Sequence, residues 1–210
     1  LEFQPVRANA MLFGRLVHQT IEDVHKAALR DEASLITAEN VTKWFEMNYA
    51  QLSRSERIYL ADPQRQAALD QVQRYVQRQG GDWGRIKQAE VDVSLVKSDY
   101  ILDGTIDLIR ADDGSVEIVD FKATKKPDII ADRDVLERYR RQLHVYAHLV
   151  EERTGERVSK MHLYYTGEED GNPMISWPYS QTAVDATVTV FDEVVQRILA
   201  KDYFTKAESL

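Results

Sequence analysis

The sequence predicts an α/β fold in which a mixed central sheet is flanked by helices and preceded by a helical section. Apolar residues recur at helical spacing through much of residues 12–79. An Asp-Gly pair, a strong hairpin signal, then lies between two apolar stretches. A second long helical pattern follows over 132–154. The predicted strands of this central part occupy 86–97, 100–110 and 115–123.

The helical section divides into three predicted helices, over 12–30, 34–52 and 55–79. Pro63 is expected to break or restart the third helix, because proline lacks a backbone N–H. Gly80-Gly81-Asp82 ends the section. The remaining predicted elements are a helix over 132–154 closed by Gly155, strands over 157–166 and 174–177, and a helix over 182–203.

The length of 210 residues fits one domain, with a helical section over 12–80 and an α/β core over 81–210. The chain opens with Leu1-Glu2 and has no initiator Met, so we expect a domain excised from a larger protein.

Composition narrows the classes of function. Hydrophobic residues make up 43 % and charged residues 30 %, as in an ordinary globular protein, and no apolar run is long enough for a membrane span. The absence of cysteine excludes disulfides and cysteine-ligated clusters. A net charge of −8 lacks the basic footprint of a free-standing, high-affinity DNA binder. A cytoplasmic location is the default expectation.

The predicted hairpin places two acidic residues face to face. With Asp113-Gly114 as the tight loop, Asp112 faces Ser115, and Asp107 then falls opposite Asp120. Carboxylates about 5 Å apart repel each other by on the order of 3 kcal/mol at an effective dielectric of about 20. A divalent cation would compensate this repulsion, because hard cations bind carboxylate oxygens.

The alternative is a solvent-facing hairpin whose acidic residues only aid solubility. The flanking strands are apolar at most positions, which is typical of strands buried on both faces and favours the metal site. Lys122 lies two residues after Asp120, so the two side chains share a face. A cation there can orient an attacking water and offset developing charge, whereas the ordinary alternative is a snorkelling lysine at a strand end.

These residues resemble the PD-(D/E)XK nuclease core, in which Gly-x-x-Asp (Gly104–Asp107) precedes Asp-x-Lys (Asp120–Lys122). Three further matches resemble the RecB-like branch: the Gly14–His18 segment, Glu90 on the preceding strand, and the Gln-x-x-x-Tyr motif of Gln142–Tyr146. The Gly14–His18 region is most similar to the C-terminal nuclease domains of UvrD/Rep-type helicases.

The resemblance implies a metal site. His18 on the first predicted helix would join Asp107 and Asp120 in binding Mg²⁺ or Mn²⁺, and the backbone carbonyl of Phe121 would complete the set. From the helix alone, a surface histidine is the ordinary interpretation of His18, and His25 is expected at the surface. Some RecB-like nucleases carry a cysteine-bound iron–sulfur cluster, which this cysteine-free sequence cannot hold.

The resemblance also implies accessory residues. Glu90 would be an accessory ligand or position a water, although a solvated edge strand would look the same. The expected nucleic-acid contacts are Gln142, Tyr146, Arg138, Lys125 and Lys126. The two lysines are either loop charges or phosphate contacts, and the sequence leaves both interpretations open.

The expected function is metal-dependent hydrolysis of DNA phosphodiesters by the nuclease domain of a helicase–nuclease in DNA repair or recombination. DNA would be the substrate, and a helicase domain in the same full-length chain the partner. One alternative is a catalytically degenerate DNA-binding or scaffold module. The other is a metal-dependent hydrolase of RNA or nucleotides.

Overall fold

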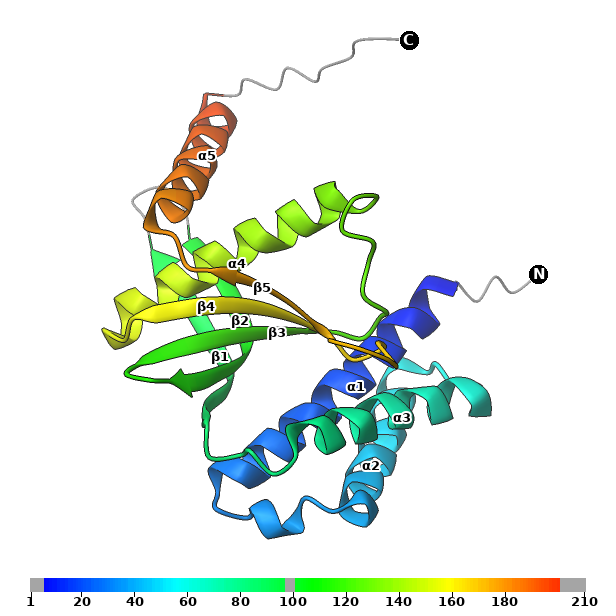
Figure 1. Ribbon diagram of the computed structural model, residues 1–210. Helices are drawn as coiled ribbons and strands as arrows, with labels where there is room; N and C mark the ends of the chain where they lie inside the picture. The colour runs from blue at the N-terminus through cyan, green and yellow to red at the C-terminus, as the bar shows by residue number, and fades with distance from the viewer. Residues whose placement is uncertain (1–5, 97–100, 201–210) are drawn as a thin grey trace, which may run out of the picture.

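The computed structural model describes residues 6–96 and 101–200 of the chain. Five strands form one mixed sheet in the order β1-β2-β3-β4-β5, as Figure 1 shows. β3 and β4 run parallel, and the other neighbours are antiparallel. The strands are β1 (Ile86–Val96), β2 (Ile101–Asp112), β3 (Ser115–Lys122), β4 (Val158–Tyr165) and β5 (Met174–Pro178). The predicted α/β class with a mixed sheet and an N-terminal helical part is confirmed.

The helical part consists of α1 (Val6–Leu29), a short 3₁₀ turn η1 (Ala33–Leu35), α2 (Ala38–Glu56) and α3 (Asp62–Gln79). α1 therefore begins before residue 12, where the apolar pattern had placed its start. The predicted break at Pro63 is confirmed, because Pro63 lies in the first turn of α3, where its missing N–H costs no helical hydrogen bond.

Two helices follow the hairpin. α4 (Arg133–Thr154) connects β3 to the parallel strand β4, and α5 (Gln181–Leu199) follows β5. Ser180 caps α5 by accepting a hydrogen bond from the Ala183 N–H. The predicted end of this helix at residue 203 lies outside the described residues. Among the described helices, none is both long and apolar enough to cross a membrane.

The β2–β3 hairpin has the predicted register. Asp113 and Gly114 both have positive φ, at 36° and 80°, as a two-residue type I′ turn requires. Asp112 pairs with Ser115, and the pairing continues up to Leu108 opposite Val119. The tight turn thus carries Asp107 and Asp120 to adjacent positions at the next step.

Helices cover both faces of the sheet (Figure 1). α1, α2 and α3 pack with Leu108, Val119 and Phe121 in one core, and α4 packs with Ile106 and Ile118 in the other. α1 contributes aliphatic side chains that are at most 1 % exposed: Leu12, Leu16, Val17, Ile21 and Val24. Burial of each such side chain contributes roughly 1.5–3 kcal/mol to the free energy of folding, so the buried face of α1 is a main source of stability.

The alternation of side chains breaks at one point in β1 and β2. Ala89 packs in the core beneath α1, yet Val91, two residues later, packs in the α4 core. Leu108 and Ile106, which pair with them, divide between the two cores in the same way. Between them, Glu90 has φ of +49°, in the left-handed region. Both strands therefore kink at this level, where Glu90 and Asp107 lie between the residues of the two cores.

Candidate active site

Asp107 lies where β2 and β3 part. Regular pairing is described only as far as Leu108 opposite Val119. One step further, the Phe121 N–H donates a 2.6 Å hydrogen bond to Asp107 Oδ2. The carboxylate thus takes the place that a β2 carbonyl would have in a continued ladder. At this point a side-chain carboxylate of β2, rather than a backbone carbonyl, accepts the hydrogen bond from β3.

His18 reaches this carboxylate from α1, with its Nδ1 3.6 Å from Asp107 Oδ2. The edge of its ring also faces Phe121, at 6.4 Å between centroids. Burial lowers the pKa of His18, but the Asp107 carboxylate, with a further contribution from Asp120, outweighs burial and leaves the pKa raised. α1 and β2 thus bring together the imidazole and the carboxylate that the sequence resemblance had linked.

Asp120 and Lys122 form the second pair of the site. Lys122 Nζ is 2.6 Å from Asp120 Oδ2, and both side chains are largely buried. The same Oδ2 is buried and has no hydrogen-bond partner of ordinary geometry among the described residues. Burial, reinforced by Asp107, raises the pKa of Asp120 even though Lys122 acts to lower it. Negative charge at this point is only partly compensated.

Glu90 lies close enough to Asp107 and Glu22 for their charges to act on its carboxyl group. Burial, followed by the charges of Asp107 and Glu22, raises the pKa of Glu90 to about 7. A left-handed conformation at a non-glycine residue costs about 1–3 kcal/mol and persists only where surrounding structure imposes it. A solvated edge strand, the ordinary alternative for Glu90, would show neither feature.

The donor set fits a hard divalent cation. Two carboxylates and an imidazole lie close together, and the pKa values of Asp120 and Glu90 are raised. Within the described residues, however, no three His, Asp or Glu side chains form a ready-made metal cage. His18 is paired with Asp107, and Asp120 with Lys122, so a cation would have to compete with Lys122 for Asp120.

The Phe121 carbonyl remains a candidate ligand on geometric grounds. In a strand, the N–H and C=O of one residue point to the same side, and the Phe121 N–H points to Asp107. The Phe121 ring lies on the face of the sheet opposite to the side chains of Asp120 and Lys122, where it contacts the rings of His25, Tyr75 and Tyr164. This aromatic anchoring fixes the backbone between Asp120 and Lys122.

His25 is not at the surface, as expected from the sequence, but 1 % exposed. Its Nε2 hydrogen-bonds the Tyr75 hydroxyl at 2.7 Å, and burial lowers the pKa of His25 to about 3. A signal was available, because His25 lies one helical turn after the buried Ile21 on the core face of α1.

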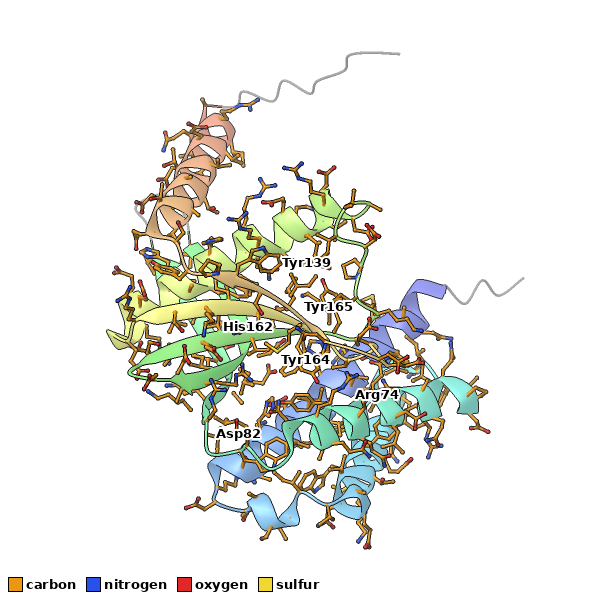
Figure 2. The ribbon with its side chains drawn as sticks, viewed as in Figure 1. Arg74, Asp82, Tyr139, His162, Tyr164 and Tyr165 are labelled. Atoms are coloured by element: carbon orange, nitrogen blue, oxygen red, sulfur yellow. The ribbon has the colours of Figure 1, made fainter. Side chains whose placement is uncertain are left out.

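Two tyrosines near Lys122 were missed by the sequence reasoning. Lys122 Nζ lies 4.4 Å from the ring centroid of Tyr139 on α4, within cation–π range. Tyr165, which pairs with Lys122 across β3 and β4, is buried. Burial, followed by Tyr139 and Asp120, raises its pKa to about 12. Figure 2 shows Tyr139 and Tyr165 beside each other between α4 and the sheet. Tyr139 lies one helical turn before Gln142, and this spacing was the sequence signal that placed it on the same face of α4 as Gln142.

The predicted nucleic-acid contacts fall in two places. Arg138, Gln142 and Tyr146 line one groove beside α4, and Gln142 Nε2 donates a 2.7 Å hydrogen bond to the Tyr146 hydroxyl. Lys125 and Lys126 instead contact the turn between β4 and β5. Lys125 Nζ is 3.6 Å from Glu169, and Lys126 Nζ donates to the Asn172 carbonyl at 2.9 Å. The structure thus gives both lysines intramolecular partners in a surface turn.

The chain matches the family model of the PD-(D/E)XK nuclease superfamily over residues 2–209. The protein belongs to this superfamily. Its members generally use divalent metals to cleave nucleic acids. No curated protein sequence matches the chain.

Two solved structures resemble the chain. A proposed exonuclease from Eubacterium rectale has a TM-score of 0.50 at 17 % sequence identity, over 79 % of this chain and 65 % of that one. The chain thus spans about two thirds of that protein's length. SSO0001 has a TM-score of 0.40 at 13 % identity, over 84 % of this chain and 86 % of that one. At such identities, the E. rectale likeness concerns the fold alone.

Proposed function

We propose that this PD-(D/E)XK domain is a DNA nuclease of the RecB-like branch that uses Mg²⁺ or Mn²⁺. The observation that carries the proposal is the convergence of His18, Asp107 and Asp120 where β2 and β3 part, with Lys122 alongside. His18 and the hydrogen-bonded Gln142–Tyr146 pair support the RecB-like part of the proposal, because the sequence resemblance assigns them to motifs of that branch.

The proposed ligands are His18, Asp107, Asp120 and the Phe121 carbonyl, with Glu90 as an accessory group. A bound divalent ion would polarise the scissile phosphate and lower the pKa of a water. Lys122 then has the position to orient that water and to offset charge that develops on the phosphate. The pKa of Glu90, raised to about 7 by burial and by Asp107 and Glu22, would fall when a cation binds, which favours a charged Glu90 as an accessory group.

The domain organisation that we propose is a single nuclease domain over residues 1–210, cut from a longer chain that also carries a helicase of the UvrD/Rep type. The acidic net charge of −8 supports a domain to which DNA is delivered, rather than one that captures DNA alone. DNA is the proposed substrate, repair or recombination the proposed role, and the cytoplasm the proposed location.

The test is cleavage of end-labelled linear and circular DNA in the presence of Mn²⁺ or Mg²⁺. We expect metal-dependent cleavage that Asp107→Asn or Asp120→Asn reduces at least about a thousandfold, as loss of a group that stabilises the transition state does. Lys160→Gln is the matched control, because Lys160 is an exposed charge on β4 away from the kink. Activity in either Asp variant equal to the wild type would refute the site.

The same assay separates the alternatives. A degenerate DNA-binding or scaffold module would bind DNA without cleaving it under any metal. A hydrolase of RNA or nucleotides would cleave those substrates in preference to DNA in a matched panel. The raised pKa values of Glu90 and Asp120 favour the active enzyme, because a scaffold has no need of clustered, partly neutralised carboxylates.

A further inference from the structure

A groove of about 500 Å³ lies between α4 and α5, at the end of β2. None of its lining residues is a proposed metal ligand. Its two walls are apolar: Val145 and Leu149 come from α4, and Val190 and Val194 from α5. Its size and apolar walls suit a flat organic group rather than an ion.

Most polar groups of the groove come from α4, and Asp103 of β2 and Thr187 of α5 add one each. Arg138 and Arg141, both exposed, line it together with Gln142 and Tyr146. The Gln142–Tyr146 hydrogen bond fixes these two side chains relative to each other. A ligand that complements this arrangement has a flat, weakly polar body and an adjoining anionic group. A nucleotide has both, since its base is planar and its phosphate suits an arginine pair.

We propose that the groove receives an unpaired nucleotide of the DNA strand, with the base between α4 and α5 and the phosphate at Arg138 and Arg141. This inference rests on the proposed nuclease function and specifies its substrate as single-stranded or locally unwound DNA. A base that is paired and stacked in a duplex presents no free face to such a groove.

The position of the groove fits a strand that passes to the candidate active site. Tyr139, which contacts Lys122, and Tyr146, which lines the groove, lie two turns apart on α4. Two turns span roughly 10 Å, on the order of three nucleotides of a stacked strand. Gly104, beneath the Tyr146 ring, precedes Asp107 by three residues on β2. One helix and one strand thus connect the groove to the site.

The test compares binding of three fluorescent oligonucleotides by the full chain in EDTA: a single-stranded dT oligomer, an abasic oligomer of the same length, and a duplex. The wild type should bind the dT oligomer about tenfold more tightly than the abasic one, as burial of one base predicts. Val194→Trp, which fills the groove, should bind the two equally. Ile198→Trp is the matched control, because Ile198 is similarly exposed on α5 but does not line the groove.

A second variant covers the case in which Val194→Trp fails to fold. Arg138→Gln with Arg141→Gln should lower the slope of log affinity against log salt by about 0.7 for the dT oligomer, because the two arginines neutralise one phosphate. Equal wild-type affinity for the dT and abasic oligomers would overturn the proposal and leave the groove to a protein partner. Equal effects of Val194→Trp and Ile198→Trp would overturn it too.

The readout in EDTA keeps this inference separate from the proposed catalysis. Base-dependent binding without metal-dependent cleavage would refute the nuclease and retain the groove. Cleavage that Asp120→Asn abolishes, in a protein with no preference for bases, would retain the nuclease and refute the groove.

Discussion

The Tyr146 ring lies directly against the backbone of Gly104. A Cβ atom at position 104 would stand 2.5 Å from Tyr146 Cε1 and 2.9 Å from its hydroxyl oxygen. Gly104 begins the Gly-x-x-Asp motif, and Tyr146 ends the Gln-x-x-x-Tyr motif. The two motifs, far apart in the chain, therefore meet in one contact, and the glycine is required by close approach rather than by its backbone conformation.

Gly104→Ala should destabilise the fold by about 1–3 kcal/mol, because the tyrosine ring must move to admit the methyl group. The displaced ring should also lose its hydrogen bond from Gln142. Urea unfolding of the variant and the wild type measures the cost. The control is the pair Tyr146→Ala and Gly104→Ala/Tyr146→Ala, in which the added methyl meets no ring. A cost of Gly104→Ala that is the same with and without Tyr146 would show that the contact is not its cause.

His18→Ala should weaken the binding of Mn²⁺ measured by titration calorimetry, with cleavage partly regained at high Mn²⁺. The loss should be greater for Mn²⁺ than for Mg²⁺, because imidazole suits manganese better than the harder magnesium. His148→Ala on α4 is the control histidine. Unchanged metal affinity in His18→Ala would show that His18 is not a metal ligand, even though its Nδ1 lies 3.6 Å from Asp107 Oδ2.

Tyr139→Leu should lower kcat about three- to thirtyfold with little change in KM, since it removes the ring that holds the Lys122 ammonium. Tyr139→Phe keeps the ring and should restore most of the rate. Single-turnover cleavage at saturating DNA measures this difference. If the Phe variant is as slow as the Leu variant, then the hydroxyl rather than the ring face matters.

His25 should make the protein less stable in mild acid. Its pKa is about 3 in the folded protein and near its ordinary value of 6.5 when unfolded, so the unfolded chain binds the extra proton. The stability due to neutral His25 is fully present above pH 6.5 and is lost as pH falls toward 3. At pH 5 the loss is about 2 kcal/mol.

The measurement is urea unfolding at pH 7.5 and pH 5.0 for the wild type and His25→Gln. The glutamine variant has no titrating group at position 25. Between pH 7.5 and pH 5.0 its free energy of unfolding should therefore fall by about 2 kcal/mol less than that of the wild type. Its lower stability at pH 7.5 reflects the altered contact with Tyr75 and serves as the reference. Equal pH dependence in the two proteins would contradict the buried, neutral histidine.

Local chemistry made the hairpin predictable. Asp113-Gly114 specifies a two-residue turn, and the turn alone aligns Leu108 with Val119. Helix ends at Pro63 and Gly155 follow from the same kind of local rule. These features depend on neighbouring residues, so a single sequence suffices for them.

Other features depend on contacts between distant segments. The left-handed conformation of Glu90 is imposed by the kink that β1 and β2 share, and no residue in its neighbourhood indicates it. The face alternation that a regular strand predicts for Asp107 fails at this kink in β2, and its carboxylate accepts a hydrogen bond from the Phe121 N–H. The burial of His25 likewise depends on Tyr75, which is contributed by α3.

The hydrogen bond from Phe121 to Asp107 turns one backbone amide into a reporter on the site. Any ligand that draws the Asp107 carboxylate away leaves this N–H without its acceptor, whereas the amides of Val119, on the β2 side, and Ile118, on the β4 side, keep their places in the sheet. Amide hydrogen exchange at Phe121 should therefore respond to occupancy of the site while its neighbours in β3 stay protected. The occupancy of the site can thus be followed by isotope exchange in a protein that is not turning over substrate.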